Sequence, residues 1–317
     1  MHLDFDPKKN ITLFDKLGIR SYSRALFLAK KFYSARVLFD DVFSSMLFLG
    51  GLKHSLKVKT GNGHFRQFVS KSDFFDWYLA EGAKEAIALG TEGNKASIRN
   101  GMIKFNFLGK EVKFHYYSAT SLNDTARMIK ENFFDEEYKM LDVKGKDVVD
   151  VGANVGDSAI YFALKGAKHV YAFEPDIKLF NAALKNVKLN GLEDNITLLN
   201  KACGNGSFVN IGGIKVRTIA LDSIIKTFIE PDDHAVLKVD CEGCEYGIIL
   251  NANKKTLEKF DQIVIEAHYG YLNLIKKLKS TGFKTGHTAP MPSFYSGSRG
   301  EAVYFNLVWA RKDCCGL

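Results

Sequence analysis

The chain has 317 residues, of which 46% are hydrophobic and 25% charged, and its net charge at pH 7 is +8. This composition is typical of a folded globular protein and argues against disorder, and the length allows one full α/β domain with a smaller one beside it. No run reaches the roughly 18 apolar residues that span a bilayer. The acidic first residues lack the basic start of a secretory signal, so we expect a cytoplasmic protein.

The positive charge is concentrated near the start of the chain. Residues 1–60 hold 11 Lys and Arg against 5 Asp and Glu, whereas residues 141–317 hold 22 against 20. Residues 21–39 have helical spacing of apolar residues, and a second helix is expected from Asp40 or Asp41 to the Gly50-Gly51 pair. We expect this basic pair of helices to pack on the main domain. Peripheral contact with an anionic membrane surface, or with a partner or RNA, stays open.

Short strands are predicted next. Residues 56–59 and 64–69 flank a Gly-Asn-Gly turn and predict a hairpin, and Ser72 can cap a helix that ends near Ala88. Turns at 100–101 and 108–110 then separate three short strands that end by Tyr117. Ser121 to Asp124 form a capping-box pattern before a helix that ends near Phe133.

From Asp147 onward, strands and helices alternate, which predicts an α/β fold with a mostly parallel sheet of seven strands and helices on both faces. Strands are expected near residues 147–151, 169–173, 196–200, 235–240, 262–266, 283–288 and 303–310. Helices are expected near residues 155–165, 177–190, 221–229, 245–253 and 270–281. The last two strands follow each other without a helix between them, so they should form an antiparallel pair at the sheet edge.

The loop after the first of these strands indicates the ligand. A dinucleotide loop needs glycine at its first, third and sixth positions, where this chain has Gly152, Asn154 and Asp157. Asp157 would repel a pyrophosphate at the start of the helix. A nucleoside ligand without phosphates fits better, and the cationic groups of S-adenosylmethionine (SAM) would be attracted by nearby acids.

The end of the second strand agrees with a nucleoside ligand. Glu174-Pro175 follows the strand 169–173, and a carboxylate at that position can accept both ribose hydroxyls. Pro175 then ends the strand. The alternative is a structural βαβ unit without a ligand, in which Glu174 is an ordinary helix-capping acid.

Five sequence motifs together resemble the FkbM family of SAM-dependent methyltransferases. They are Asp150 to Ser158, Glu174-Pro175, Leu221-Asp222-Ser223, Leu237 to Glu245, and Ile263 to His268. The resemblance covers roughly residues 120–290 and implies the class I methyltransferase (Rossmann-like) fold. It also implies methylation of a hydroxyl oxygen on a sugar, glycan or other small metabolite.

The resemblance divides the chain into an N-terminal extension, residues 1–118, and a methyltransferase domain, residues 119–317. In class I methyltransferases such an extension often helps to shape the acceptor pocket, and we expect the same here. The residues expected to bind SAM lie at the ends of the first three strands of the domain. They are Asp150, Gly152, Ala153, Asn154, Gly156, Asp157, Ser158, Glu174, Pro175, Asn200, Lys201 and Ala202.

Four residues at the ends of the next two strands are the candidate catalytic groups, because ligands of an open parallel sheet lie outside the carboxyl ends of its strands. Asp240 is expected to bind or activate the acceptor, and Glu242 could share that task or only complement a helix dipole. Glu266 and His268 share one face if the strand continues that far, and His268 is a candidate general base. No metal ligand is assigned, although these four residues could instead hold Mg²⁺.

The cysteines predict neither a disulfide framework nor a zinc site. The five are few and unevenly placed. Cys241 and Cys244 have metal-ligand spacing, but no second pair completes a zinc site. Many relatives have an aliphatic or small residue at these two positions.

Two rival functions stay open. One is RNA methylation, because residues 186–192 resemble a segment of some tRNA-modifying enzymes. The nearly neutral catalytic region argues against a nucleic-acid track, and Asp240 is not followed by the Pro-Pro-aromatic motif of exocyclic-nitrogen methylation. The other rival is a non-catalytic SAM-binding protein. The sequence does not identify the acceptor or the oligomeric state.

Overall fold

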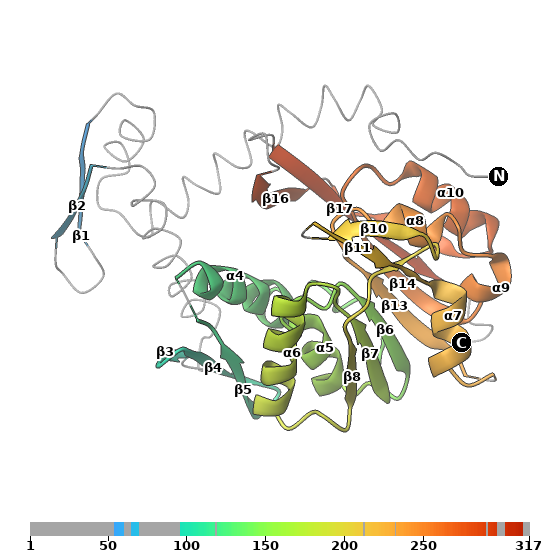
Figure 1. The fold of residues 1–317 in the computed structure, drawn as a ribbon, viewed down its shortest axis with the longest axis horizontal. Helices are drawn as coiled ribbons and strands as arrows, with labels where there is room; N and C mark the ends of the chain where they lie inside the picture. Colours follow the sequence, from blue (N-terminus) through green and yellow to red (C-terminus); the bar gives the residue numbers. More distant parts are fainter. Residues whose placement is uncertain are drawn as a thin grey trace. The chain divides into compact units, whose positions relative to one another are not determined.

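The computed structural model describes residues 54–59, 65–69, 96–117, 119–211, 213–231, 233–289, 291–296 and 302–312. The helices predicted within residues 21–50 and 72–88 lie outside these ranges. The described residues form two compact units, one that ends at Asp135 and one that begins at Glu136 (Figure 1). The boundary after residue 118 stays a prediction.

The first unit contains the predicted short strands. Its β1 and β2 pair antiparallel, and β3, β4 and β5 form an antiparallel meander in chain order, which confirms both predictions. Buried aromatic side chains hold the meander to the segment that follows it, with the Phe105 and Phe133 ring centroids 5.1 Å apart. The strands are β1 (Leu56–Lys59), β2 (Phe65–Phe68), β3 (Ser97–Arg99), β4 (Met102–Phe107) and β5 (Lys110–His115).

Helix α4 (Ala119–Ile129) begins two residues before Ser121 and continues into a π-helical turn, η2 (Lys130–Phe134). The predicted capping box is therefore wrong, because Ser121 lies inside the helix and not at its start. The predicted end of the helical segment near Phe133 is confirmed.

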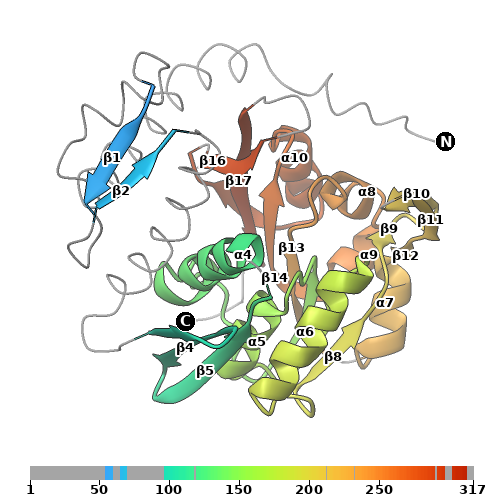
Figure 2. The same ribbon diagram turned by 60° about the vertical axis from the view of Figure 1, so that its left-hand side comes forward.

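The second unit is built on one sheet whose main path has the strand order β15-β17-β14-β13-β6-β7-β8. Figure 1 shows β17, β14, β13, β6, β7 and β8 side by side, and Figure 2 shows the same sheet from another side. Six of these strands run in one direction, and β17 runs antiparallel between β14 and β15, so β15 and β17 form the antiparallel edge pair that the sequence predicts. The strands are β6 (Asp147–Val151), β7 (His169–Phe173), β8 (Ile196–Leu199), β13 (Ala235–Val239), β14 (Phe260–Ala267), β15 (Lys284–His287) and β17 (Ala302–Arg311), with β16 (Met291–Ser296) paired to β17.

Helices cover the sheet, which is the mostly parallel α/β fold of class I methyltransferases. Their bounds are α5 (Asp157–Leu164), α6 (Ile177–Leu189), α7 (Leu221–Phe228), α8 (Glu245–Ile249), α9 (Lys254–Leu257) and α10 (Leu272–Ser280). The helix predicted over 245–253 ends at Ile249, four residues early. A separate short helix, α9, begins after Asn253, whose side chain accepts a hydrogen bond from the Thr256 N–H. No helix of the described residues is long and apolar enough to cross a membrane.

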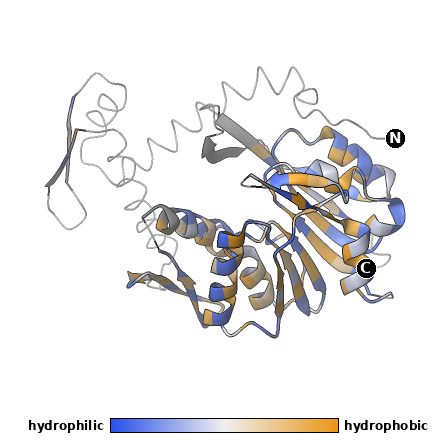
Figure 3. Ribbon diagram, viewed as in Figure 1, coloured by the Kyte–Doolittle hydropathy of each residue, from blue (hydrophilic) through white to orange (hydrophobic). Residues whose placement is uncertain are grey.

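The central strands are buried along their whole length and are mostly apolar, as strands covered on both faces are, and Figure 3 shows this band of hydrophobic residues. Every residue of β6 and β13 is buried. Alternate residues such as Val149, Leu237 and Ile263 belong to one large apolar cluster with α7 to α10. The opposite alternation places two charged residues, Asp150 and Lys238, together on the other face of neighbouring strands.

Two small strand pairs follow β8, and the sequence analysis did not predict them. They are β9 (Cys203–Gly204), which pairs with β12 (Ile219–Ala220), and a hairpin of β10 (Phe208–Ile211) and β11 (Ile214–Arg217). The first of these pairs is parallel and ties the end of β8 to the start of α7.

Candidate active site

The loop after β6 turns sharply because three of its residues have left-handed backbone. The φ angles of Gly152, Asn154 and Gly156 are 82°, 48° and 85°. A Cβ on Gly152 would lie 1.7 Å from the carbonyl oxygen of Asp240, so only glycine lets the end of β13 approach this loop. The predicted cofactor loop is thus packed directly against the predicted acceptor-side strand.

Glu174, at the end of β7, holds the same loop. Its Oε2 accepts a hydrogen bond from the Asn154 N–H at 3.0 Å, and its Oε1 accepts one from the Asp176 N–H at 2.8 Å. The side-chain amide of Asn200 donates to the Glu174 and Pro175 carbonyl oxygens at 2.8 and 3.0 Å. Each carboxylate oxygen keeps a further lone pair for a ligand hydroxyl.

The other predicted cofactor residues surround this loop and the end of β8. Ala153 is buried and its N–H donates to the Phe173 carbonyl oxygen at 3.0 Å. Lys201 is exposed, whereas Ala202 is buried. A pocket of about 440 Å³ opens here, and its walls include Asn200, Lys201, Gly206, Val216, Arg217, Thr218, Ile219, Ala220 and Ser223.

Asp150 is fully buried beneath the loop. Its Oδ2 accepts a hydrogen bond from the Ser158 hydroxyl at 2.7 Å, and its Oδ1 lies 3.1 Å from the Lys238 Nζ. Burial raises the pKa of Asp150 above its usual range, and the ammonium of Lys238 opposes that rise. Asp157, in the first turn of α5, is also buried, and burial raises its pKa to about 7.

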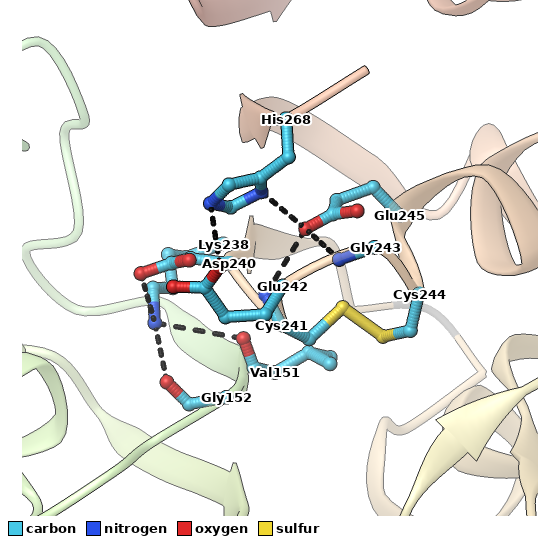
Figure 4. Close-up of a disulfide and its surroundings, with 10 residues drawn as sticks. All are labelled: Val151, Gly152, Lys238, Asp240, Cys241, Glu242, Gly243, Cys244, Glu245 and His268. Atoms are coloured by element: carbon cyan, nitrogen blue, oxygen red, sulfur yellow. Dashed lines mark hydrogen bonds and ion pairs between the residues drawn. A yellow bond between two sulfur atoms is a disulfide. The ribbon is translucent and has the colours of Figure 1, made fainter. Parts of the chain in front are cut away.

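Lys238 links the cofactor loop to the acceptor side (Figure 4). Its Nζ donates to the Gly152 carbonyl oxygen at 2.7 Å and lies 3.9 Å from the Asp240 Oδ2. Burial by itself lowers the pKa of Lys238, but the carboxylates of Asp150 and Asp240 raise it by more than burial lowers it. The pKa of Lys238 is therefore above the usual value for lysine, and the ammonium stays charged. Its side chain is only 2% exposed, so it is a buried cation between two acids.

The segment after β13 is closed by a disulfide between Cys241 and Cys244, shown in Figure 4. The sequence analysis considered metal-ligand spacing for this pair and did not predict the bond. Within the loop the backbone N–H groups of Cys241 and Gly243 donate to the Glu245 Oε1, at 3.2 and 3.1 Å. Glu245 is therefore a buried acceptor for the loop, and its role exceeds complementation of a helix dipole.

His268 lies at the centre of the acidic group. Its Nδ1 is 3.0 Å from the Glu245 Oε1, and its Nε2 is 3.3 Å from the Glu242 Oε2 and 3.5 Å from the Glu266 Oε1. The structure therefore brings together the candidate catalytic residues that the sequence places at the ends of β13 and β14.

The surroundings of His268 oppose its predicted role as a general base. Burial by itself lowers the pKa of His268, but the carboxylates of Glu245 and Glu242 outweigh it and raise the pKa to about 9. A histidine with that pKa carries a proton at neutral pH and cannot accept another. Asp240 is the more accessible group, with 28% of its side chain exposed.

Comparison with known proteins shows the family in which this arrangement of residues is found. Residues 150–285, which contain the glycine loop and both groups of acids, match the methyltransferase FkbM domain. The chain is also 30% identical over 151 residues to protein 158B of Sulfolobus islandicus rod-shaped virus 1, covering 47% of this chain and 78% of that protein. The chain belongs to the FkbM methyltransferase family. It is therefore a SAM-dependent methyltransferase.

Other similarities concern methyltransferases of several kinds. The FkbM protein is 32% identical over 119 residues to ribosomal protein L11 methyltransferase of Carboxydothermus hydrogenoformans, covering 38% of each chain. Its structure is similar to that of M. capricolum TrmK in complex with S-adenosylhomocysteine, at 18% identity and a TM-score of 0.39. That similarity covers 56% of this chain and 67% of the other.

The sequence analysis assigned neither a catalytic nor a cofactor-binding role to two residues of this FkbM site. Lys238 is a lone cation within an otherwise apolar strand, which is a signal that a buried partner exists. Glu245 gives no such signal, because an acid at the start of a helix is common. Its contact with His268, 23 residues later, depends on how α8 and β14 pack together.

Proposed function

We propose that this methyltransferase transfers the methyl group of SAM to a hydroxyl oxygen of a sugar, glycan or other small metabolite. The observation that supports the proposal is the position of Asp240. It follows β13, beside the loop after β6, and one of its carboxylate oxygens is within 4.8 Å of ligand atoms of Glu266 and His268. A hydroxyl acceptor needs such a group, because it must lose a proton during the transfer.

The predicted cofactor residues and the acidic group divide the tasks of the reaction. The loop Gly152 to Gly156 and Glu174 would hold the methionine and ribose parts of SAM, with the positive sulfonium toward the acids. The acceptor oxygen then attacks the methyl carbon in line with the sulfur. The new C–O bond forms as the C–S bond breaks, S-adenosylhomocysteine leaves, and the hydroxyl proton passes to Asp240 and then to water.

RNA methylation has less support. The segment that favoured it contains Asn186, which is fully buried and whose side-chain amide donates to the Val155 carbonyl oxygen at 2.9 Å. That contact joins α6 to the cofactor loop, so packing is sufficient to explain why Asn186 is at this position. The segment after β13, Asp240-Cys241-Glu242-Gly243, places acids where an RNA phosphate would be repelled.

The test is methyl transfer from methyl-labelled SAM into separate acceptors. We expect the labelled methyl group to be incorporated into members of a panel of methyl glycosides and nucleotide sugars. The product should be a methyl ether, which survives mild alkali. We expect no label in total RNA. Asp240→Asn should lower turnover at least 100-fold while cofactor affinity changes less than about threefold. Incorporation into RNA alone would overturn the proposal, and binding of SAM without any transfer would favour the non-catalytic alternative.

A further inference from the structure

Three side chains with metal-binding atoms meet at the carboxyl ends of β13 and β14. Asp240, Glu266 and His268 each contribute one atom to a group whose members lie within 4.8 Å of one another. Acids gather at many active sites without an ion, so their proximity alone identifies no ligand. The environment of the imidazole supplies the second observation.

The two nitrogens of His268 have different surroundings. Nδ1 faces the Glu245 Oε1, which already accepts two backbone N–H groups and therefore acts as an acceptor, so Nδ1 carries a hydrogen. Nε2 is buried and makes no hydrogen bond, although oxygens of Glu242 and Glu266 lie 3.3 and 3.5 Å from it. The His268 side chain is 1% exposed. A buried nitrogen that faces two carboxylates at these distances needs a positive species between them, which is either a proton or a metal ion that takes the place of the proton.

We propose that Asp240, Glu266 and His268 bind one divalent cation, with Glu245 as the residue that orients the imidazole. A histidine ligand commonly donates its other ring N–H to a carboxylate, which is the arrangement of His268 with Glu245. One imidazole nitrogen with two carboxylate oxygens suits a first-row cation such as Mn²⁺. Mg²⁺, which the sequence analysis left open, prefers oxygen ligands alone.

The side chains can close on such an ion. A ligand distance of about 2.1 Å allows roughly 4.2 Å between opposite ligand atoms, so the observed spread of up to 4.8 Å needs only small rotations. The Asp240 and Glu266 side chains are 28% and 13% exposed and have room to turn. The Lys238 ammonium opposes a cation, but it lies closer to Asp150, at 3.1 Å, than to Asp240, at 3.9 Å.

The catalytic role of this cation rests on the proposed function, and the cation would explain how the acceptor hydroxyl is activated. A cation that binds the acceptor hydroxyl lowers the pKa of that hydroxyl and fixes its oxygen near the methyl group. Asp240 would bind through one oxygen and keep the other for the departing proton. The bonds made and broken in the transfer stay the same.

The first test measures binding without any acceptor. The full chain, freed of metal with EDTA, is titrated with Mn²⁺ and followed by electron paramagnetic resonance. We expect one Mn²⁺ per chain and an affinity at least tenfold lower in Glu266→Gln, with Asp240→Asn as a second variant. The surface variant Glu258→Gln should match the wild type, since that side chain is 45% exposed and its ion pair among the described residues is with Lys254. No saturable binding, or equal affinity in all variants, would mean that a proton fills the position and would overturn the site.

Activity measurements separate this proposal from the proposed function. If Mn²⁺ binds once per chain but no hydroxyl acceptor is methylated, the proposed function fails and the cation site stands. If methylation of a hydroxyl is unchanged by EDTA and by added Mn²⁺, the cation site fails and the proposed function stands. Thermal melts of each variant confirm that it is folded before either conclusion is drawn.

Discussion

At the scale of single residues, the site depends on the buried ion pair between Lys238 and Asp150, which the protein forms from its own side chains. Lys238 and Asp150 are 2% and 0% exposed and lie 3.1 Å apart. A buried pair is not itself strong evidence of stability, but removing one partner leaves the other uncompensated. The lysine therefore holds two acids, Asp150 and Asp240, close to the cofactor loop.

Lys238→Met should destabilise the protein by about 3–5 kcal/mol, because it leaves the buried Asp150 without its cation. The double variant Lys238→Met with Asp150→Asn should recover most of that loss. Urea unfolding measures both, and Lys226→Met is the matched control on an ammonium that is 79% exposed. If Lys238→Met alone were as stable as the wild type, the Lys238–Asp150 ion pair would not be needed for stability.

Gly152→Ala should cost roughly 3–5 kcal/mol, since it combines a left-handed backbone with a Cβ 1.7 Å from the Asp240 carbonyl oxygen. Gly191→Ala is the matched control. That glycine also has positive φ, 62°, but an added Cβ would meet nothing within 4 Å, so only about 1 kcal/mol is expected. Equal losses in both variants, measured by chemical unfolding, would refute the close approach of β13 to the loop.

Asp157 predicts a pH dependence of stability. Its pKa is raised to about 7 by burial, from an ordinary value of 3.8, so the folded state binds more protons than the unfolded state between these values. Stability from this group is therefore greatest at low pH and is lost as the pH rises toward 7. Relative to Asp157→Asn, which does not titrate, the wild type should lose up to about 4 kcal/mol between pH 4 and pH 8. A difference that is flat across this range, in paired unfolding curves, would refute the shift.

At the scale of elements, the segment between β13 and α8 positions the acidic group. The disulfide closes this segment, and the backbone N–H groups of Cys241 and Gly243 hold Glu245, which in turn contacts His268. Glu242, within the loop, has a positive φ of 56°. The loop conformation and the position of the imidazole are thus coupled through one carboxylate.

Replacing both Cys241 and Cys244 with serine should lower stability by about 2 kcal/mol, the loop-entropy value for so short a closed segment. Reduction with a dithiol should reproduce the effect in the wild type and leave the double variant unchanged. Calorimetric melts with and without the reductant compare the two proteins. Identical melts of the wild type under both conditions would show that the bond does not hold this loop.

The same elements show what the sequence could predict. Strands 147–151 and 169–173 match β6 and β7 at both ends, because an apolar β-branched run between turn signals admits few alternatives. The β10–β11 hairpin was missed, since its residues, such as Asn210 and Lys215, carry weak strand signals and pair only locally. The capping box predicted at Ser121 was wrong, because the helix already begins at Ala119.

At the scale of the whole molecule, the sheet order brings distant parts of the chain to one edge. The ends of β6, β13 and β14 are neighbours, although residues 151, 239 and 267 are far apart in sequence. The sequence could therefore place each acid at a strand end. It could not show that Glu245 contacts His268, or that two cysteines pair, because those contacts depend on the packing of loops.

The central claim is that SAM binds at the ends of β6 and β7, with Glu174 as the ribose partner. Calorimetric titration of the full chain with S-adenosylhomocysteine tests it most directly. We predict one site per chain, an affinity at least 100-fold weaker in Glu174→Gln, and no change in the surface variant Glu258→Gln. Absent binding in the wild type, or equal affinity in Glu174→Gln, would contradict the account.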